Sequence, residues 1–245
     1  MKGVILAAGK GTRMRELTKD RPKPMLEVAK RSILEHIFDA LKQANIRELV
    51  VVTGYFANII EDHFGDGSNF GMKITYVRQE VQDGTGSALL LTEPVLKDEP
   101  HFFMTYGDII TSPENYPRFI RAYEERPCDA QLALSWVDDP WRGAAVYLDG
   151  DRVIDIVEKP PKGTSKSNWN NAGLYVFRNM IYDYLKKIDL SPRGEYELTD
   201  AIKLMIKDGR DVRGVKLSGY WGDMATPEDI ERMTKILEEQ RQQHG

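Results

Sequence analysis

Short apolar runs alternate along this chain with longer segments of helical periodicity. The runs are typical of strands buried on both faces, and in the first half they cover residues 4–7, 48–53, 72–77 and 102–106. Between them, apolar residues recur every three or four positions over 32–44 and 56–64, and Ser32 is suited to cap the first of these helices. Strand and helix in alternation predict βαβ units around a parallel sheet.

The second half of the chain continues this alternation, with strands predicted over 129–137, 174–177 and 212–217. Helices are predicted over 113–126, 181–187, 198–207 and 226–243. We expect residues 142–148 and 152–157 to form a hairpin, because Asp149-Gly150 between them is a strong signal for a type I′ turn. The last helix is charged and amphipathic, so it packs either on the rest of the chain or on a second copy in a homo-oligomer.

The loop after the first strand, AGKGTR over residues 8–13, has the composition of an anion site. Gly9 and Gly11 allow a sharp turn whose bare N–H groups form a nest for anions. Arg13 adds a planar cationic fork suited to phosphate oxygens. Lys23 follows ten residues later, between two prolines that restrict the backbone. Together these features indicate a polyphosphate site.

Two common phosphate loops do not fit this segment. The P-loop pattern G-x-x-x-x-G-K-[ST] fails because Gly9-Lys10 is followed by Gly11 and the required first glycine is Val4. The dinucleotide loop G-x-G-x-x-G fails because Met14 stands where it needs glycine. On the glycine pair alone, an ordinary strand–loop turn with solvated charges explains the segment equally well.

A longer string changes that balance. The chain carries LAAGKGTRM over residues 6–14, then Leu17-Thr18, then PKPM over 22–25. This string resembles the signature of the sugar-1-phosphate nucleotidyltransferases, which form an NDP-sugar and pyrophosphate from an NTP and a sugar 1-phosphate. It departs at Glu16, usually proline, and at residues 30–32, KRS, which replace a common G-x-P. Neither departure removes a phosphate ligand.

The resemblance covers nearly the whole chain and implies its architecture. The implied fold is α/β, a three-layer α/β/α, Rossmann-like nucleotidyltransferase fold (GT-A-like) with a mostly parallel mixed sheet. It implies a single nucleotidyltransferase domain over residues 1–245. Within that domain we expect a nucleotide-binding part at about 1–112, a sugar-phosphate-binding part at about 113–225 and a C-terminal helix at 226–243.

Composition narrows the range of partners. The chain has 34 basic and 38 acidic residues, a net charge of −4, which argues against a nucleic-acid surface. Cys128 is its only cysteine, which excludes an intramolecular disulfide and fits a reducing cytoplasm. The sequence shows no signal-peptide pattern and no apolar run of about 18 residues, so we expect a cytoplasmic protein with no membrane partner.

The resemblance implies a nucleotide site made of two loops. The first loop would bind through Leu6, Ala7, Ala8, Gly9, Gly11, Thr12 and Arg13. The second, QEVQDGTG over residues 79–86, would hold the base through Gln79, Gly84 and Thr85. A Gln amide offers both a donor and an acceptor to a pyrimidine edge. A plain loop-to-helix turn capped by Thr85 would look similar.

Two aspartates are implied as ligands of a Mg²⁺ cofactor. Asp108 follows the strand over 102–106, at the end of the strand where open α/β sheets bind ligands. Asp223 lies in WGDMATPED over 221–229, which resembles W-x-D-[IVT]-G-T-P-E-D with Ala225 in place of glycine. One carboxylate plus substrate phosphates is a usual way to hold Mg²⁺. A turn or capping role stays open for Asp108, and the D-x-D at 149–151 is interpreted as turn chemistry.

The sugar phosphate is expected at a third group of residues, which the resemblance assigns to Gly143, to EKP over 158–160 and to NAG over 171–173. Glu158 can accept hydrogen bonds from sugar hydroxyls, and Lys159 can pair with the phosphate. Asn171 can both donate to and accept from a hydroxyl. The alternative is a solvated Glu–Lys pair and an asparagine at the start of a strand.

The implied reaction is an in-line attack of the sugar phosphate on the α-phosphate of the NTP. A phosphate monoester has a second pKa of about 6, so the nucleophile is already ionised and needs no general base. Lys159 would hold the attacking phosphate, while Arg13 and Lys23 would neutralise the departing pyrophosphate.

The choice of NTP and the reaction class leave alternatives. Ala8 and the Gln79 loop resemble the uridylyl and thymidylyl branches, which favours UTP and then dTTP, while a GTP- or CTP-using member stays open. A metal-dependent glycosyltransferase is a second class, against which Arg13 and Lys23 argue. A non-catalytic nucleotide-binding subunit is a third, against which the presence of both implied metal-ligand aspartates and of both phosphate lysines, Lys23 and Lys159, argues.

Overall fold

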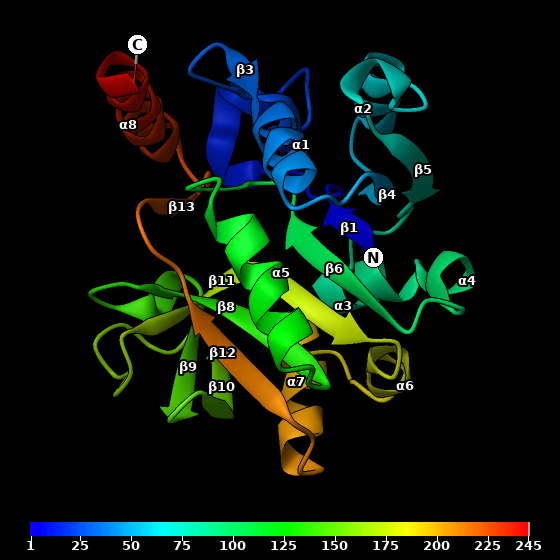
Figure 1. Cartoon of the computed structure of the whole chain (residues 1–245), viewed down its shortest axis with the longest axis vertical. Coiled ribbons are helices and arrows are strands. Elements are labelled where there is room, and N and C mark those ends of the chain that lie inside the picture. Colours follow the sequence, from blue (N-terminus) through cyan, green and yellow to red (C-terminus); the bar gives the residue numbers. More distant parts are fainter. Residues whose placement is uncertain (245) are drawn as a thin grey trace.

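The structure, a computed structural model of the chain, describes residues 1–244, apart from the side chains of Thr12, Arg15, Gln243 and His244. Within these residues, nine strands form one sheet in the order β5-β4-β1-β6-β11-β8-β12-β10-β9 (Figure 1). Their bounds are β1 Lys2–Leu6, β4 Glu48–Thr53, β5 Lys73–Arg78, β6 His101–Tyr106, β8 Ala130–Trp136, β9 Ala144–Asp149, β10 Arg152–Glu158, β11 Trp169–Arg178 and β12 Val212–Lys216. Only β10 and β11 run opposite to the other strands of this sheet, so the expected mixed, mostly parallel sheet is confirmed.

Helices cover both faces of the sheet. Alternate residues of β1 explain this arrangement, since Ile5 packs into one buried cluster while Val4 and Leu6 pack into another. The Ile5 cluster includes side chains from α1 Ile33–Gln43, α2 Ala57–Phe64, α5 Asn115–Glu125 and α8 Pro227–His244. The opposite cluster includes side chains from α3 Thr85–Leu90, α4 Glu93–Leu96, α6 Ile181–Leu185 and α7 Leu198–Lys207. The expected three-layer α/β/α fold is confirmed.

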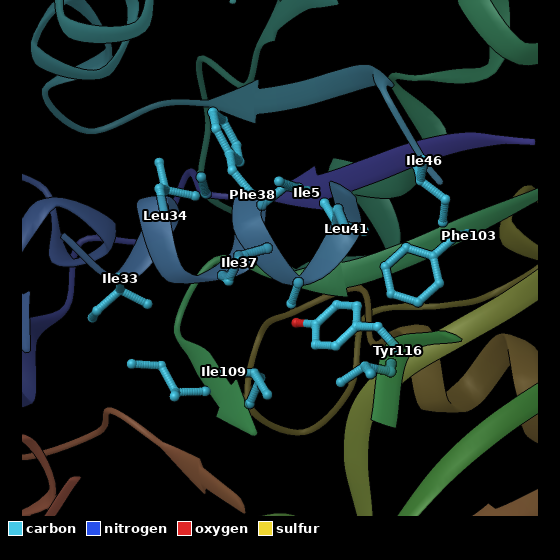
Figure 2. Close-up of a cluster of buried hydrophobic side chains, with 14 of the residues drawn as sticks. Ile5, Ile33, Leu34, Ile37, Phe38, Leu41, Ile46, Phe103, Ile109 and Tyr116 are labelled. Atoms are coloured by element: carbon cyan, nitrogen blue, oxygen red, sulfur yellow. The ribbon is translucent and has the colours of Figure 1, made fainter. Parts of the chain in front are cut away.

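Helix α1 shows how the sequence pattern produces this packing. Figure 2 shows its apolar face beside Ile5 of β1 and Phe103 of β6, and Ile37 in this face is 1% exposed. The predicted cap is confirmed, because Ser32 Oγ accepts from Glu35 N at 3.2 Å and Ser32 N donates to Glu35 Oε2 at 2.8 Å. The helix is thereby fixed against β1 and β6, the strands that lead into the candidate site.

Several short elements complete the fold. Two-stranded pairs are formed by β2 Glu27–Val28 with β3 Arg31–Ser32 and by β7 Ile109–Thr111 with β13 Trp221–Asp223. The 3-10 helices are η1 Thr12–Thr18, η2 Lys23–Met25, η3 Ser68–Phe70 and η4 Pro140–Arg142. No helix in the described part of the chain is long and apolar enough to cross a membrane.

The last helix, α8, packs on its own chain. Met233 is fully buried in the Ile5 cluster, and Ala29 N donates to Thr234 Oγ1 at 3.2 Å. At the start of the helix, Thr226 N donates to Asp229 Oδ2 at 2.9 Å and Asp229 N to Thr226 Oγ1 at 3.4 Å, so these two residues cap the helix. Of the two alternatives expected for this helix, it therefore packs on the rest of its own chain.

The hairpin of β9 and β10 forms where it was predicted, but its predicted type I′ turn is wrong. Asp149 pairs with Arg152, so the two turn residues are Gly150 and Asp151. A type I′ turn needs a positive φ at both, whereas only Gly150 has one, of 63°. A glycine with positive φ at the first central position is typical of a type II′ turn. The turn begins one residue later than the Asp-Gly pattern suggested.

Candidate active site

The carboxyl ends of three parallel strands bring the predicted nucleotide residues and Asp108 to one edge of the sheet. The glycine loop follows β1, Gln79 follows β5 and Asp108 follows β6. Backbone hydrogen bonds continue past the strand ends, with Ala7 N donating to Val52 O at 2.8 Å and Gln79 N to Thr53 O at 2.7 Å. This edge is where open α/β sheets bind their ligands.

The glycine loop folds back against Lys23. Gly11 has the left-handed backbone conformation, with φ 60° and ψ 37°, and a Cβ there would lie 3.0 Å from Lys23 Cβ. Thr18 Oγ1 donates to Gly11 O at 3.1 Å and closes the loop. Only a glycine can adopt the left-handed conformation at position 11 and leave room for Lys23 at low cost. Arg13, on η1, is exposed and therefore free to meet a ligand from solvent.

Lys23 and the two predicted metal-ligand aspartates form a compact charged group. The Lys23 ammonium makes an ion pair with Asp108 Oδ2, and the lysine is only 9% exposed. Asp223 lies on β13, opposite Ile109 of β7, and Met224 N donates to Asp108 O at 2.8 Å. Burial raises the pKa of Asp223, and the negative charge of Asp108 raises it further. The two carboxylates are therefore close enough to interact.

This donor set fits a cation that also takes ligands from its substrate. Among the described residues, no group of three or more His, Cys, Asp or Glu side chains is arranged to hold a metal ion. Mg²⁺ is commonly bound by one or two carboxylates together with substrate phosphates, rather than by an all-protein cage. Asp108 and Asp223 fit that requirement, because they supply two neighbouring carboxylates and leave the remaining ligands to the substrate.

The second predicted loop is held by a distant segment of the chain. Gly84 has a φ of 129°, and a Cβ there would lie 2.4 Å from the backbone oxygen of Tyr196. Tyr196 N donates to Asp83 O and Gly86 N donates to Tyr196 O, both at 2.7 Å. Leu198 N donates to Thr85 Oγ1 at 3.1 Å. We name residues 195–200 the bracing segment, because its backbone fixes this loop.

The bracing segment also reaches the predicted sugar-phosphate residues. Thr199 Oγ1 donates to Glu158 Oε2 at 3.2 Å, and Arg193, just before the segment, donates to Glu158 Oε1 at 3.3 Å. Burial raises the pKa of Glu158, and burial followed by the charge of Arg193 lowers the pKa of Lys159. Lys159 has a strained φ of 42°, and its N donates to Gly143 O at 2.7 Å.

Asn171 lies beside this group at an irregularity in β11. The pairing of β11 with β8 shifts between Asn171 and Tyr175, and Asn171 Nδ2 donates to the Tyr175 hydroxyl at 2.5 Å. Tyr175 and Tyr106 hydroxyls lie 3.2 Å apart, which connects Asn171 to the end of β6, two residues before Asp108. A Cβ at Gly143 would lie 2.3 Å from Asn170 Oδ1, so a larger residue there would displace the Asn170 side chain.

The structure thus connects the residues predicted for the nucleotide, for the metal ion and for the sugar phosphate. Sequence reasoning missed four residues that link these groups: Arg142, Arg193, Tyr196 and Thr199. Arg142 bonds Asp229 Oδ2 at 3.1 Å, and its charge opposes the rise in the Asp223 pKa. Tyr196 and Thr199 lie in the string EYELTD over residues 195–200, which resembles a segment common in the sugar-1-phosphate nucleotidyltransferases. That string was the available signal for Tyr196 and Thr199.

Comparisons with known proteins found related sequences. The family described as nucleotidyl transferase matches residues 2–240. A bifunctional protein GlmU from Methanococcus maripaludis strain C5 is 38% identical over 94% of this chain, which spans only about half (53%) of that relative's length. The UTP–glucose-1-phosphate uridylyltransferase AglF from Haloferax volcanii is 35% identical over 99% of both chains.

A solved structure is similar over nearly its whole length. It is that of a protein from Bacillus anthracis assigned as a glucose-1-phosphate thymidylyltransferase, in complex with sucrose. It is 30% identical, its TM-score is 0.87, and the match covers 96% of this chain and 94% of the other.

Proposed function

The chain belongs to the nucleotidyl transferase family, and from this premise we propose that it transfers a nucleotidyl group from an NTP to a sugar 1-phosphate. One observation carries the proposal. The glycine loop, the half-buried Lys23–Asp108 ion pair and Asp223 meet at the carboxyl edge of the sheet. A triphosphate there would meet the positive charges of Arg13 and Lys23 and a pair of carboxylates that can bind a cation.

The proposed step needs positioning and charge rather than proton transfer. An oxygen of the sugar phosphate attacks the α-phosphorus, and the bond from that phosphorus to the bridging oxygen of the β-phosphate breaks. Pyrophosphate leaves with the electron pair. Lys159 orients the attacking phosphate, while Arg13, Lys23 and the N–H groups of residues 9–12 balance the charge of the pyrophosphate. When bound by Asp108 and Asp223, Mg²⁺ would add positive charge beside the phosphates.

The substrate roles follow the two halves of the site. In our proposal, residues 1–112 bind the nucleotide through the glycine loop and through Gln79, Gly84 and Thr85. Residues 113–225 bind the sugar phosphate through Gly143, Glu158, Lys159 and Asn171. Glu158 is already held by Thr199 and Arg193, so its orientation is set before a sugar binds.

UTP is the favoured nucleotide in this proposal, with dTTP next. The names of the relatives AglF and the Bacillus anthracis protein refer to uridylyl and thymidylyl transfer, respectively. Both bases are pyrimidines with the same pairing edge. The proposal covers the 245 residues of this chain and extends to no activity of the longer bifunctional relatives.

The test is pyrophosphate release with Mg²⁺ over a grid of five NTPs against a panel of sugar 1-phosphates. We expect release with UTP or dTTP and with one or a few of the sugars. Release with GTP alone would contradict the choice of base. Transfer from an NDP-sugar without pyrophosphate chemistry would contradict the reaction class, and tight NTP binding with no turnover would indicate a binding subunit.

A further inference from the structure

Three oxygen atoms surround the amide nitrogen of Gln79. Its Nε2 lies 2.9 Å from Ser87 Oγ, 3.2 Å from Gly84 O and 3.3 Å from Asp83 Oδ1. Gln79 is only 5% exposed, so protein atoms rather than solvent surround most of its side chain. The surrounding oxygens therefore decide which way the amide points.

These oxygens permit one amide orientation. The carbonyl of Gly84 and the carboxylate of Asp83 can only accept hydrogen bonds. Ser87 donates its hydroxyl hydrogen to Asp83 Oδ1, so it also meets Gln79 as an acceptor. Turning the amide over would place the carbonyl oxygen of Gln79 against three acceptors and leave buried groups unpaired. The Gln79 Oε1 is thus fixed on the other side of the amide, where it accepts no hydrogen bond from any described residue.

The position of Gln79 matches a base whose phosphates lie at the glycine loop. Gln79 N bonds Thr53 O at the end of β4, and Tyr55 N bonds Ala8 O at 3.3 Å beside it. Neighbouring strands lie about 4.8 Å apart, so Gln79, just after β5, is about 10 Å from the loop that follows β1. Gly54 lies between them, where a Cβ would be 2.8 Å from Ala8 Cβ and 3.0 Å from Gln82 Nε2.

We propose that Asp83 and Ser87 are positioning residues that lock the Gln79 amide and thereby select a base that carries a ring N–H on its pairing edge. Uracil, thymine and guanine carry such a proton, whereas cytosine and adenine present a lone pair there. A fixed acceptor oxygen bonds the first group and repels the second. This inference rests on the proposed function and adds to it the two residues that fix the direction of the base contact.

Matched variants test the lock. Asp83→Ala removes the acceptor that faces both Gln79 and Ser87, whereas Asp83→Asn keeps an Oδ1 that can accept both bonds. The backbone bond from Tyr196 N to Asp83 O does not depend on the side chain. Ser87→Ala removes one acceptor, and Glu80→Ala is a control that removes an exposed carboxylate from the same loop.

The measurement is kcat/KM for UTP, dTTP, GTP, CTP and ATP, with affinities for UTP and CTP by calorimetry. In the wild type we expect a base with a ring N–H to be preferred over CTP and ATP. In Asp83→Ala the ratio of UTP to CTP falls roughly tenfold, because a freed amide can turn its N–H toward cytosine. Ser87→Ala shows a smaller fall, while Asp83→Asn and Glu80→Ala keep the wild-type ratio.

The outcomes separate this inference from the proposed function. If Asp83→Ala lowers the UTP and CTP values in parallel, Asp83 only holds the loop and the inference is overturned while the enzyme class stands. A wild type that prefers CTP or ATP overturns it as well. If no NTP is turned over but UTP binds more tightly than CTP and Asp83→Ala removes that difference, the inference stands and the proposed function fails. Failure of every NTP to bind overturns both.

Discussion

Arg13 is the exposed cation of the glycine loop, and its exposure makes its chemical role separable from folding. We expect Arg13→Ala to leave the free energy of unfolding unchanged and to lower kcat/KM by a factor of 10² to 10³. That factor corresponds to about 3–4 kcal/mol, the cost of removing one group that stabilises developing charge. Steady-state kinetics with pyrophosphate detection and urea unfolding provide the two readings.

Arg21→Ala is the matched control for Arg13. Arg21 is also exposed and pairs only with its neighbour Asp20 among the described residues. Exposed pairs of this kind contribute little to stability. We therefore expect near-wild-type kinetics from this variant. Equal losses in the two variants would assign the effect to net charge, and full activity in Arg13→Ala would remove Arg13 from the mechanism.

Glu158 makes the free energy of unfolding depend on pH, with a sign that follows from the direction of its pKa shift. Burial raises its pKa above the ordinary 4.5 despite the nearby charges of Lys159 and Arg193. The folded state therefore holds the proton more tightly than the unfolded chain, and this carboxyl lowers stability as the pH rises from about 4.5 through the folded-state pKa. Glu158→Gln stays neutral, so we expect it to be more stable than the wild type at pH 7.

Urea unfolding of both proteins at pH 7 and at pH 4 checks this expectation. At pH 4 the wild-type carboxyl is protonated in the folded state, so the difference between the two proteins should shrink. Thr199→Val removes one hydrogen bond to Glu158 without changing its charge and serves as the comparison. A Glu158→Gln variant that is less stable than the wild type at pH 7 would show that its ion pair with Arg193 outweighs the cost of burial.

At the scale of elements, the β2–β3 hairpin has a strained backbone at residues where the sequence departs from the family signature. Residues 30–32 depart from the G-x-P common in similar proteins, and the structure places Lys30 at φ 67° after Ala29 at φ 49°. A left-handed conformation costs a residue with a Cβ about 1–2 kcal/mol. We expect Lys30→Gly to stabilise the protein by roughly 0.5–1 kcal/mol after the entropy cost of glycine.

Thermal unfolding measures this change, with an expected rise in melting temperature of about 1–3 °C. Lys30→Ala is the control, because it removes the same charge but keeps the Cβ that causes the strain. Equal stability of the alanine and glycine variants would mean that the charge of Lys30, and not its backbone conformation, sets the stability of the hairpin.

The long elements were predictable because their signals are local. The apolar run of β4 and the cap and periodicity of α1 each lie within a dozen residues, and the structure forms both elements with nearly the expected bounds. Strands β7 and β13 are three residues each and have no such pattern. They exist because they pair with each other across the chain, which no local rule detects.

The candidate site likewise contains residues that local sequence patterns predict and contacts that only the folded chain creates. The glycine loop and Asp108 could be assigned from the sequence, since each follows a recognisable strand. The ion pair of Lys23 with Asp108 joins residues 85 positions apart, and the bond from Leu198 to Thr85 spans 113 positions. Such contacts depend on strand order, so the bracing function of residues 195–200 could not be derived from their composition.

At the scale of the whole molecule, the bracing segment couples the two halves of the proposed site. Tyr196 holds the loop at Gly84, while Thr199, three residues later, holds Glu158. In Gly84→Ala the new Cβ would lie 2.4 Å from Tyr196 O, so the bracing segment must move. Because small displacements of positioning groups cost large factors in rate, we expect KM to rise about tenfold for both the NTP and the sugar 1-phosphate.

Gly150→Ala separates coupling from backbone strain. Gly150 also has a positive φ, of 63°, but it lies in the β9–β10 turn with open space around it, so alanine strains the backbone without moving the bracing segment. We expect this variant to lose stability with both KM values unchanged. If Gly84→Ala raised the KM for the NTP alone, the two halves would bind independently and the segment would brace only the nucleotide loop. A rise in both values would show that one stretch of backbone sets the geometry for both substrates.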